Sequence, residues 1–257
     1  MPTLDVDGVA INYVAEGNGP AVVLVHGFAS SLHGNWRAPG IIDALTAAGR
    51  RVIALDCRGH GRSGKPHDPE AYAGTKMPDD VIAAMDHLGV AQADLIGYSM
   101  GGFLAASLLV RRPERFRSVV LAGVGDVVLA GGRSREWTDA MARVLEADDG
   151  GASETPTARA FRAFAELTGN DLGALAAMQR ARRERVDAAK LGDVALPVMV
   201  LMGESDTLVG SGDRLAAAIP GARLVKVPGD HLTAVGAPEL RRAIVEFLAE
   251  HSLVAGP

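Results

Sequence analysis

Residues 93–112 read ADLIGYSMGGFLAASLLVRR, and this stretch carries the strongest indication of the fold. Its beginning is typical of a buried strand, and the run from Gly101 onward is typical of a helix. The joint between them, GYSMG at residues 97–101, fits the pattern G-x-S-x-G of a tight strand-to-helix turn called a nucleophile elbow. A chain with 31 glycines can contain this pentapeptide by chance. Its place between a strand and a helix therefore carries the evidence, and it predicts that the Ser99 hydroxyl stands above the sheet.

Strand-like runs recur on both sides of this segment. They lie at residues 21–25, 51–56, 93–98, 118–123, 197–203 and 222–227. Their hydrophobicity is continuous rather than alternating, which is typical of parallel strands that are buried on both faces. The opening segment TLDVDGVAINY instead alternates around Asp7-Gly8 and predicts an antiparallel hairpin. Because helical patterns separate the runs, we predict an α/β fold with a doubly wound, mostly parallel eight-stranded sheet and an antiparallel edge.

The helical patterns between the strands have recognisable ends. Residues 78–88 begin at Pro78 with an acidic pair in the first turn, and they stop before Gly89, a residue type that often follows a helix. Residues 237–250 form a last amphipathic pattern. We expect a helix in each of these two segments.

The alternation of strands and helices breaks between residues 129 and 191, where no strand-like run occurs. We predict that residues 129–191 form a helical cap inserted into a core made of residues 1–128 and 192–257. Within this cap, Thr155 and Pro156 are expected to be the N-cap and the first residue of a helix.

The predicted cap carries an apolar stripe of Trp137, Met141, Phe161 and Phe164 at helical spacing. Such a stripe ordinarily packs against a core, but its side chains can also line a pocket. We expect these four residues to contribute to substrate binding. A basic run at residues 180–185 follows, with acidic residues interleaved, and it is expected to be a solvated helix face rather than a phosphate site.

A serine hydroxyl is a weak nucleophile at neutral pH, so it needs a base to take its proton and an acid to orient that base. His231 follows the last strand-like run, and Asp206 follows the run before it. Both loops are expected at the carboxyl edge of the sheet, where they face the crevice above Ser99. The chain order Ser99, Asp206, His231 is the one that accompanies a G-x-S-x-G elbow. Asp126 ends another strand-like run and is the rival acid, whereas Asp230 adjoins His231 and is poorly placed to orient it.

Acyl transfer at a serine also requires two N–H donors for the oxyanion that forms on the attacked carbonyl. One is expected from the amide of Met100, the residue after the nucleophile, and the other from the loop after the first central strand. In that loop Gly27 permits an unusual turn, so the Phe28 amide can point toward Ser99 while its ring forms an apolar wall for substrate. His26 is expected to be structural.

Five segments, HGFASS, DCRGHGRS, GYSMGG, GESD and DHLTAV, resemble in order and spacing the motifs of the α/β-hydrolase superfamily. The resemblance covers nearly all of the predicted core. It is greatest to small bacterial serine esterases and lactone hydrolases with a short helical cap. The resemblance implies a small to medium carboxylic ester or lactone as substrate, an acyl-enzyme and no cofactor. One departure is Asp230, where many relatives have glycine before the catalytic histidine.

Composition argues against several other classes. The formal charge of −5 offers no general attraction for nucleic acid or anionic lipid. The single cysteine, Cys57, excludes an internal disulfide framework. No leader is visible, no apolar run approaches the ~18 residues of a membrane span, and the histidines lack the spacing of a metal site. We expect a cytoplasmic protein, a monomer or small homo-oligomer without metal, whose partner is a small-molecule ester.

Other chemistries remain open on the same residues. In the superfamily, epoxide hydrolases and dehalogenases use aspartate as nucleophile and dienelactone hydrolases use cysteine, so Ser99 argues against all three. Carbon–carbon bond hydrolases, hydroxynitrile lyases and cofactor-free perhydrolases carry the same triad and remain alternatives, as does a low-turnover ligand-binding protein. The pattern G-x-G-x-x-G at residues 59–64 is not read as a dinucleotide site, because Pro66 and Pro69 prevent a helix from starting there.

Overall fold

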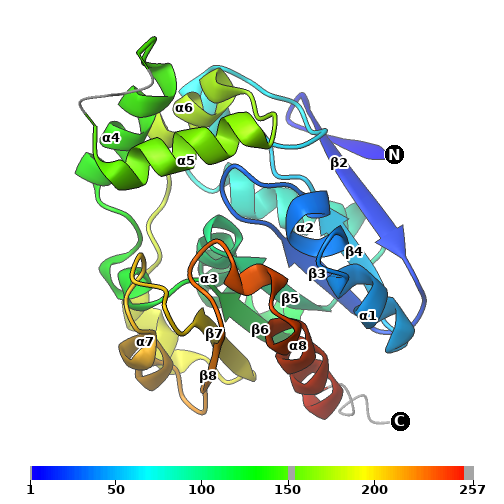
Figure 1. The fold of residues 1–257 in the computed structure, drawn as a ribbon. Coiled ribbons are helices and arrows are strands. Elements are labelled where there is room, and N and C mark those ends of the chain that lie inside the picture. Colours follow the sequence, from blue (N-terminus) through cyan, green and yellow to red (C-terminus); the bar gives the residue numbers. More distant parts are fainter. Residues whose placement is uncertain (1, 150–153, 252–257) are drawn as a thin grey trace.

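The computed structural model describes residues 2–149 and 154–251 and contains an eight-stranded sheet (Figure 1). The strands are β1 (Thr3–Val6), β2 (Val9–Glu16), β3 (Ala21–Val25), β4 (Arg51–Leu55), β5 (Ala93–Tyr98), β6 (Phe116–Ala122), β7 (Val198–Gly203) and β8 (Arg223–Val227). Their order across the sheet is β1-β2-β4-β3-β5-β6-β7-β8. The remaining residues of the predicted core and cap, 1, 150–153 and 252–257, lie outside the described residues.

Strand direction follows the sequence prediction. β4, β3, β5, β6, β7 and β8 are parallel to one another, while β2 runs antiparallel to β1 and β4. The β1–β2 hairpin turns at Asp7 and Gly8, whose φ angles are 53° and 78°. Two consecutive positive φ angles are what a tight two-residue hairpin requires. The predicted eight-stranded, mostly parallel sheet with an antiparallel edge is confirmed.

β8 departs from the expectation that every parallel strand is buried on both faces. β3 is buried along its whole length, whereas only Val227 is buried in β8. β8 is the last strand in the sheet order and has a neighbour on one side only. Its charged residues, Arg223 and Lys226, pair with carboxylates near the surface, at distances of 2.5 and 3.4 Å. Edge strands of this kind carry charges that discourage further strand pairing.

Helices cover both faces of the sheet and create two apolar layers. One layer includes residues of α2 (Lys76–His87) and α3 (Met100–Arg111), and the other includes residues of α1 (Ile41–Ala47) and α8 (Pro238–His251). A short helix, α7 (Asp213–Ala218), packs beside β7 and β8. α2 and α8 lie within two residues of the predicted helices. Within the described ranges, no helix is both long enough and apolar enough to span a bilayer.

Three further helices, α4 (Arg135–Glu146), α5 (Pro156–Leu167) and α6 (Leu172–Arg180), lie between β6 and β7 in the chain. They gather at one end of the molecule, above the start of α3 (Figure 1). α5 begins as predicted, since Thr155 is its N-cap and accepts a hydrogen bond from the Ala158 amide at 3.2 Å. Pro156 occupies the first helical position, where its missing N–H is no loss.

The basic run after α6 is not the solvated helix face that the sequence predicted. The helix ends at Arg180, and the next residues are extended and pair with the backbone of Gly74. The Gly74 amide donates to the Arg182 carbonyl at 2.9 Å, and the Glu184 amide donates to the Gly74 carbonyl at 3.0 Å. This pairing with a distant segment turns Arg183 inward, so that it is only partly exposed. Alternating charge in the sequence could not reveal that contact.

Candidate active site

Ser99 lies between β5 and α3 in a strained backbone conformation, with φ 52° and ψ −111°. Both flanking glycines are required by close approach of the chain. A Cβ at Gly97 would lie 2.1 Å from the Gly101 carbonyl oxygen, and one at Gly101 would lie 2.0 Å from the Val25 carbonyl oxygen. Any other residue type would force the strand, the turn or the helix apart. The G-x-S-x-G pattern therefore has a steric cause in this fold.

The structure brings Ser99, His231 and Asp206 together from three loops. Ser99 Oγ lies 2.8 Å from His231 Nε2, and His231 Nδ1 lies 2.7 Å from Asp206 Oδ2. The carboxylate favours the tautomer with the proton on Nδ1, which leaves Nε2 free to accept the serine proton. Both His231 and Asp206 are 8% exposed, so water competes little for these bonds. The arrangement can activate Ser99 as a nucleophile.

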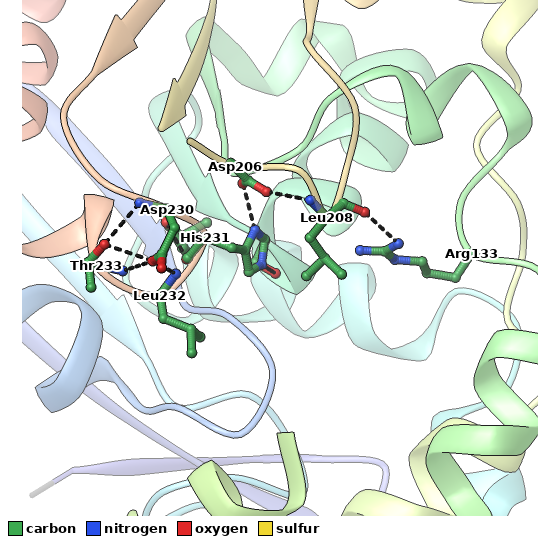
Figure 2. A network of polar contacts seen from close by, with 9 residues as sticks. Arg133, Asp206, Leu208, Asp230, His231, Leu232 and Thr233 are labelled. Carbon is green, nitrogen blue, oxygen red and sulfur yellow. Dashed lines mark hydrogen bonds and ion pairs between the residues drawn. The ribbon is translucent and has the colours of Figure 1, made fainter. Parts of the chain in front are cut away.

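Neighbouring groups hold the acid and the base in place (Figure 2). The other oxygen of Asp206 accepts a hydrogen bond from the Leu208 amide at 2.9 Å, and the Leu208 carbonyl accepts one from Arg133 at 2.9 Å. On the opposite side, the Tyr98 hydroxyl donates to the His231 carbonyl at 2.8 Å. These contacts restrain the loop that carries Asp206 and the loop that carries His231.

Asp230 precedes the histidine but faces away from its ring. Its Oδ1 accepts hydrogen bonds from the Thr233 hydroxyl at 2.7 Å, the Thr233 amide at 2.9 Å and the Leu232 amide at 3.0 Å (Figure 2). The Thr233 bonds lower the pKa of Asp230. Asp230 therefore shapes the turn that presents His231, a role that its position in the sequence did not reveal.

Asp126, the rival acid, lies elsewhere. Its carboxylate accepts a hydrogen bond from the Leu215 amide at 3.0 Å and one from the Ser211 hydroxyl at 3.3 Å. These partners belong to α7 and the segment before it. No hydrogen bond joins Asp126 to His231 within the described ranges, so the geometry favours Asp206 as the acid.

Two backbone amides beside Ser99, those of Phe28 and Met100, donate to no other group in the part of the chain that the structure describes. Two hydrogen bonds restrain the loop that carries Phe28. Asn35 Oδ1 accepts the Gly27 amide at 2.7 Å, and His26 Nε2 accepts the Cys57 amide at 2.9 Å. Asn35 was not identified from the sequence, because nothing in its local pattern distinguishes it from an ordinary surface asparagine.

A second restraint reaches the same loop from the segment after α5. The Ala29 carbonyl accepts hydrogen bonds from the Thr168 hydroxyl at 2.9 Å and the Asn170 amide group at 2.8 Å. Ala29 has a φ of 57°, an unfavourable value for a residue with a Cβ. These long-range hydrogen bonds stabilise that conformation, and no local sequence pattern indicated them.

Two cavities meet at Ser99. The first has a volume of about 290 Å³ and is lined by Tyr98, Ser99, Phe164, Asn170, His231 and Leu232, among others. The second has a volume of about 310 Å³ and is lined by Ser99, Met100, Phe103, Leu104, Trp137 and Gln179, among others. Phe28 and Phe161 line both cavities, and their ring centroids are 5.9 Å apart. Volumes of this size suit a small ligand.

Four of the five expected substrate-binding residues reach these cavities. Phe28, Phe161, Phe164 and Trp137 line one or both of them. Met141 does not, since it is 1% exposed and belongs to the apolar core. α4 packs against α6, and Met141 is buried there although Trp137, one turn earlier, reaches the second cavity. The expectation that Met141 contributes to substrate binding has no support in either cavity.

The described residues contain no group of three or more His, Cys, Asp or Glu side chains placed to hold a metal ion. The glycine-rich loop at residues 59–64 turns tightly around Asp56 and does not begin a helix. Asp56 Oδ1 accepts the Leu32 amide at 2.8 Å, and its Oδ2 accepts the Arg62 amide at 2.9 Å. The geometry of this loop is that of a structural turn.

Known proteins resemble the chain over different lengths. It is 40% identical to the bifunctional epoxide hydrolase 2 of Sus scrofa over 112 residues, which are 44% of this chain but only 20% of that relative. It is 29% identical to the 3-oxoadipate enol-lactonase 2 of Acinetobacter baylyi in an alignment of 259 positions that covers 95% of this chain and 94% of the relative.

A solved structure of a hydrolase from Pseudomonas aeruginosa PA01 superimposes with a TM-score of 0.77 at 30% identity, over 96% of this chain and 97% of the other. The family model described as "alpha/beta hydrolase fold" matches residues 20–187. This range contains the elbow at Ser99 and the loop that carries Phe28. Together with the sheet order, this match shows that the chain belongs to the α/β hydrolase fold family.

Proposed function

We propose that the chain is a serine hydrolase that cleaves a small to medium carboxylic ester or lactone through an acyl-enzyme. The observation that carries the proposal is the unbroken series of contacts from Ser99 to His231 to Asp206, at 2.8 and 2.7 Å. Two unused amides beside it, at Phe28 and Met100, supply the donors that an oxyanion needs. No cofactor takes part in the proposed reaction.

The reaction would proceed in two halves. Ser99 Oγ attacks the carbonyl carbon as its proton passes to His231 Nε2, and the carbonyl oxygen becomes an oxyanion held by the Phe28 and Met100 amides. Collapse of this intermediate breaks the ester C–O bond, and His231 gives its proton to the leaving alcohol oxygen. Water then attacks the acyl carbon by the same route and releases Ser99. Each oxyanion donor is worth about 3 kcal/mol of transition-state stabilisation.

The relatives support hydrolase activity, and their names imply hydrolysis of different bonds. The relative that aligns over almost its whole length is an enol-lactonase, which fits an ester or lactone substrate. The epoxide hydrolase aligns over a fifth of its length. Epoxide hydrolases of this superfamily use aspartate at the nucleophile position, so Ser99 favours the ester or lactone reaction.

Two alternatives use the same residues. A carbon–carbon bond hydrolase, hydroxynitrile lyase or cofactor-free perhydrolase would share the triad and differ in the substrate that the cavities accept. A low-turnover ligand-binding protein would keep the fold without effective catalysis. The unused amides at Phe28 and Met100 favour an enzyme, because a mere binding site has no need for unpaired N–H donors near a serine that is hydrogen-bonded to a histidine.

A fluorophosphonate probe and a substrate panel test the proposal together. We expect covalent labelling of the wild type and none of Ser99→Ala, with turnover of simple esters or lactones in the panel. Folded wild-type protein that resists labelling would contradict the serine mechanism and favour a binding protein. Labelling together with turnover of only an α-hydroxynitrile or a carbon–carbon bond substrate would replace the ester assignment by the corresponding alternative.

A further inference from the structure

Arg183 presents its side chain to the second cavity without a partner. Its backbone forms an isolated bridge with Gly74, and its side chain is among those that line the cavity. No hydrogen bond or ion pair involves this side chain in the part of the chain that the structure describes. A guanidinium carries five N–H donors, and at this position protein groups use none of them.

The surroundings of Arg183 make this lack of partners costly. Burial lowers the pKa of Arg183 to about 10, and no nearby carboxylate opposes that effect. The group is still protonated at neutral pH. Arg183 is only partly exposed, and a cation that has lost part of its water without gaining a counter-charge is less favourable than one that is paired. An unpaired arginine in this position does not stabilise the fold, which suggests that Arg183 serves to bind a ligand.

The other arginines that line the same cavity either have hydrogen-bond or ion-pair partners or are exposed to solvent. Arg133 donates to the Leu208 carbonyl and lies over the Trp137 ring, with its guanidinium carbon 4.7 Å from the ring centroid. Arg135 pairs with Asp139 at 3.0 Å, and Arg185 donates to the Ala130 carbonyl. Arg182, the neighbour of Arg183, is exposed to solvent. Among the arginines that line this cavity, Arg183 alone is drawn inward and has no partner within the described residues.

A second buried group in this cavity also lacks partners. Gln179, on α6, is 3% exposed and lines the cavity. Its Oε1 is buried without a hydrogen-bond partner, and no hydrogen bond involves its Nε2 among the described residues. An amide left unpaired in the interior costs free energy that a polar ligand can recover. Gln179 thus points independently to a polar ligand at the same place.

The charged residues of the cavity indicate that the ligand carries a negative charge. Its lining contains arginines at positions 133, 135, 182, 183 and 185 and one carboxylate, Glu184. Glu184 Oε2 already lies 3.7 Å from Arg111 Nε. The same lining contains Ser99 and several apolar residues, among them Phe103, Leu104 and Met77. The cavity therefore contains the proposed nucleophile and an unpaired cation, with apolar side chains among its other lining residues.

We infer that the second cavity binds a carboxylate of the substrate, held by the Arg183 guanidinium and the Gln179 amide, at a distance from the carbonyl that Ser99 attacks. The planar fork of arginine matches a carboxylate, and one unpaired cation matches a single negative charge. The substrate class is accordingly an ester or lactone that carries a second, free carboxylate beyond an apolar spacer. This inference rests on the proposed serine hydrolase function and narrows its substrate.

Boronic acids test it because they form a tetrahedral adduct with an active serine. We would measure inhibition constants for paired alkylboronic acids of equal chain length, one ending in a methyl group and the other in a carboxylate, across several lengths, against hydrolysis of 4-nitrophenyl acetate. In the wild type, the carboxylate should improve binding by about 10- to 100-fold at the matching length, as expected for hydrogen bonds to a charged group. The ratio within each pair cancels general effects on Ser99.

Three variants and one control complete the test. Arg183→Gln should reduce the ratio to near one, Arg183→Lys should keep part of it, and Gln179→Met should lower it less. Arg214→Gln removes an equal charge from an exposed residue that lines neither cavity, and it should keep the wild-type ratio. Arg183→Lys and Gln179→Met keep the test decisive if Arg183→Gln fails to fold.

The outcomes separate the two proposals. A wild-type ratio near one at every length, or a full ratio in the Arg183 variants, overturns the carboxylate site while the methyl-terminated compounds still report an active Ser99. Failure of all boronic acids to inhibit a folded protein overturns the serine hydrolase function and the inference with it.

Discussion

The polar groups around Ser99 and those on the basic wall of the second cavity are arranged in opposite ways. At the Ser99 end, hydrogen bonds of 2.8 and 2.7 Å join Ser99 to His231 and His231 to Asp206, and contacts from Leu208 and Tyr98 restrain the acid and the base. At the Arg183 end, Arg183 and Gln179 are drawn inward and unpaired within the described residues. The first arrangement is complete before any ligand arrives. The second becomes favourable only when a ligand supplies the missing partner.

This difference separates two requirements of catalysis. Groups that act on the transition state work best when they are preorganised, because nothing has to reorient as charge develops. Groups that select the substrate can remain unpaired until it binds. A ligand with the anion then supplies their missing partners and binds more tightly than a ligand without it. Phe28 and Phe161 line both cavities and form the border between the two functions.

Removal of the nucleophile gives the largest expected effect on the preorganised end. Ser99→Ala should lower ester turnover by roughly 10⁶-fold, because serine and histidine act as a unit. Steady-state rates with an activated ester and a melting curve for each protein measure this. Since the alanine fits the same backbone, folding should be retained. A folded variant with most of its activity would break the assignment of this end as catalytic.

The acid comes next. Asp206→Asn should cost about 10⁴-fold in turnover, because the amide no longer fixes the proton on His231 Nδ1. Asp126→Asn is the matched control, since Asp126 also follows a strand but bonds to Leu215 and Ser211. It should change turnover by much less. The reverse order of effects would move the acid to the end of β6 and contradict the geometry at His231.

Met141 on α4 and Phe161 on α5 are expected to differ in role, since Met141 packs in the core and Phe161 lines both cavities. Met141→Ala should lower the free energy of unfolding by about 2–5 kcal/mol and scale all substrates alike, because it opens a hole in the core. Phe161→Ala should instead reorder an acyl-chain-length series, with changes of about 1–3 kcal/mol between substrates. Denaturant unfolding and a rate series from acetate to octanoate measure both. An unchanged ranking in Phe161→Ala would remove its part in substrate selection.

The expected effect that is confined to stability concerns another buried polar group, His60, which packs against the Phe28 ring at a centroid distance of 6.0 Å. Burial, together with the nearby charges of His26, Lys65 and Arg183, lowers the pKa of His60 to about 3. Between its ordinary pKa and pH 3, the unfolded chain binds a proton that the folded chain excludes. Stability should therefore fall on acidification from about pH 6.5 toward pH 3, by up to about 1.4 kcal/mol per pH unit for this residue.

Urea unfolding between pH 7 and pH 4 measures that slope. His60→Gln should flatten it, and His33→Gln, which alters an exposed histidine, is the control that should not. An equal slope in wild type and His60→Gln would show that His60 is not kept neutral by the fold.

Local patterns were enough to predict the sheet and the three residues that meet at Ser99. The elbow depends on two glycines next to the serine, and the steric reason lies within a few residues of it. The strands show as short apolar runs, and the hairpin as alternation around Asp7-Gly8. The order Ser99, Asp206, His231 follows from loops that all lie at one edge of a parallel sheet.

Tertiary structure alone decided the rest, because the deciding contacts join distant segments. The bond from Thr168 to Ala29 spans 139 residues, and the pairing of Arg183 with Gly74 joins the segment after α6 to the segment before α2. Sequence periodicity shows which side of a helix is apolar, and it does not show what covers that side. Met141 therefore became core, and Arg183, in a run expected to face solvent, was turned by backbone pairing into a cavity that leads to Ser99.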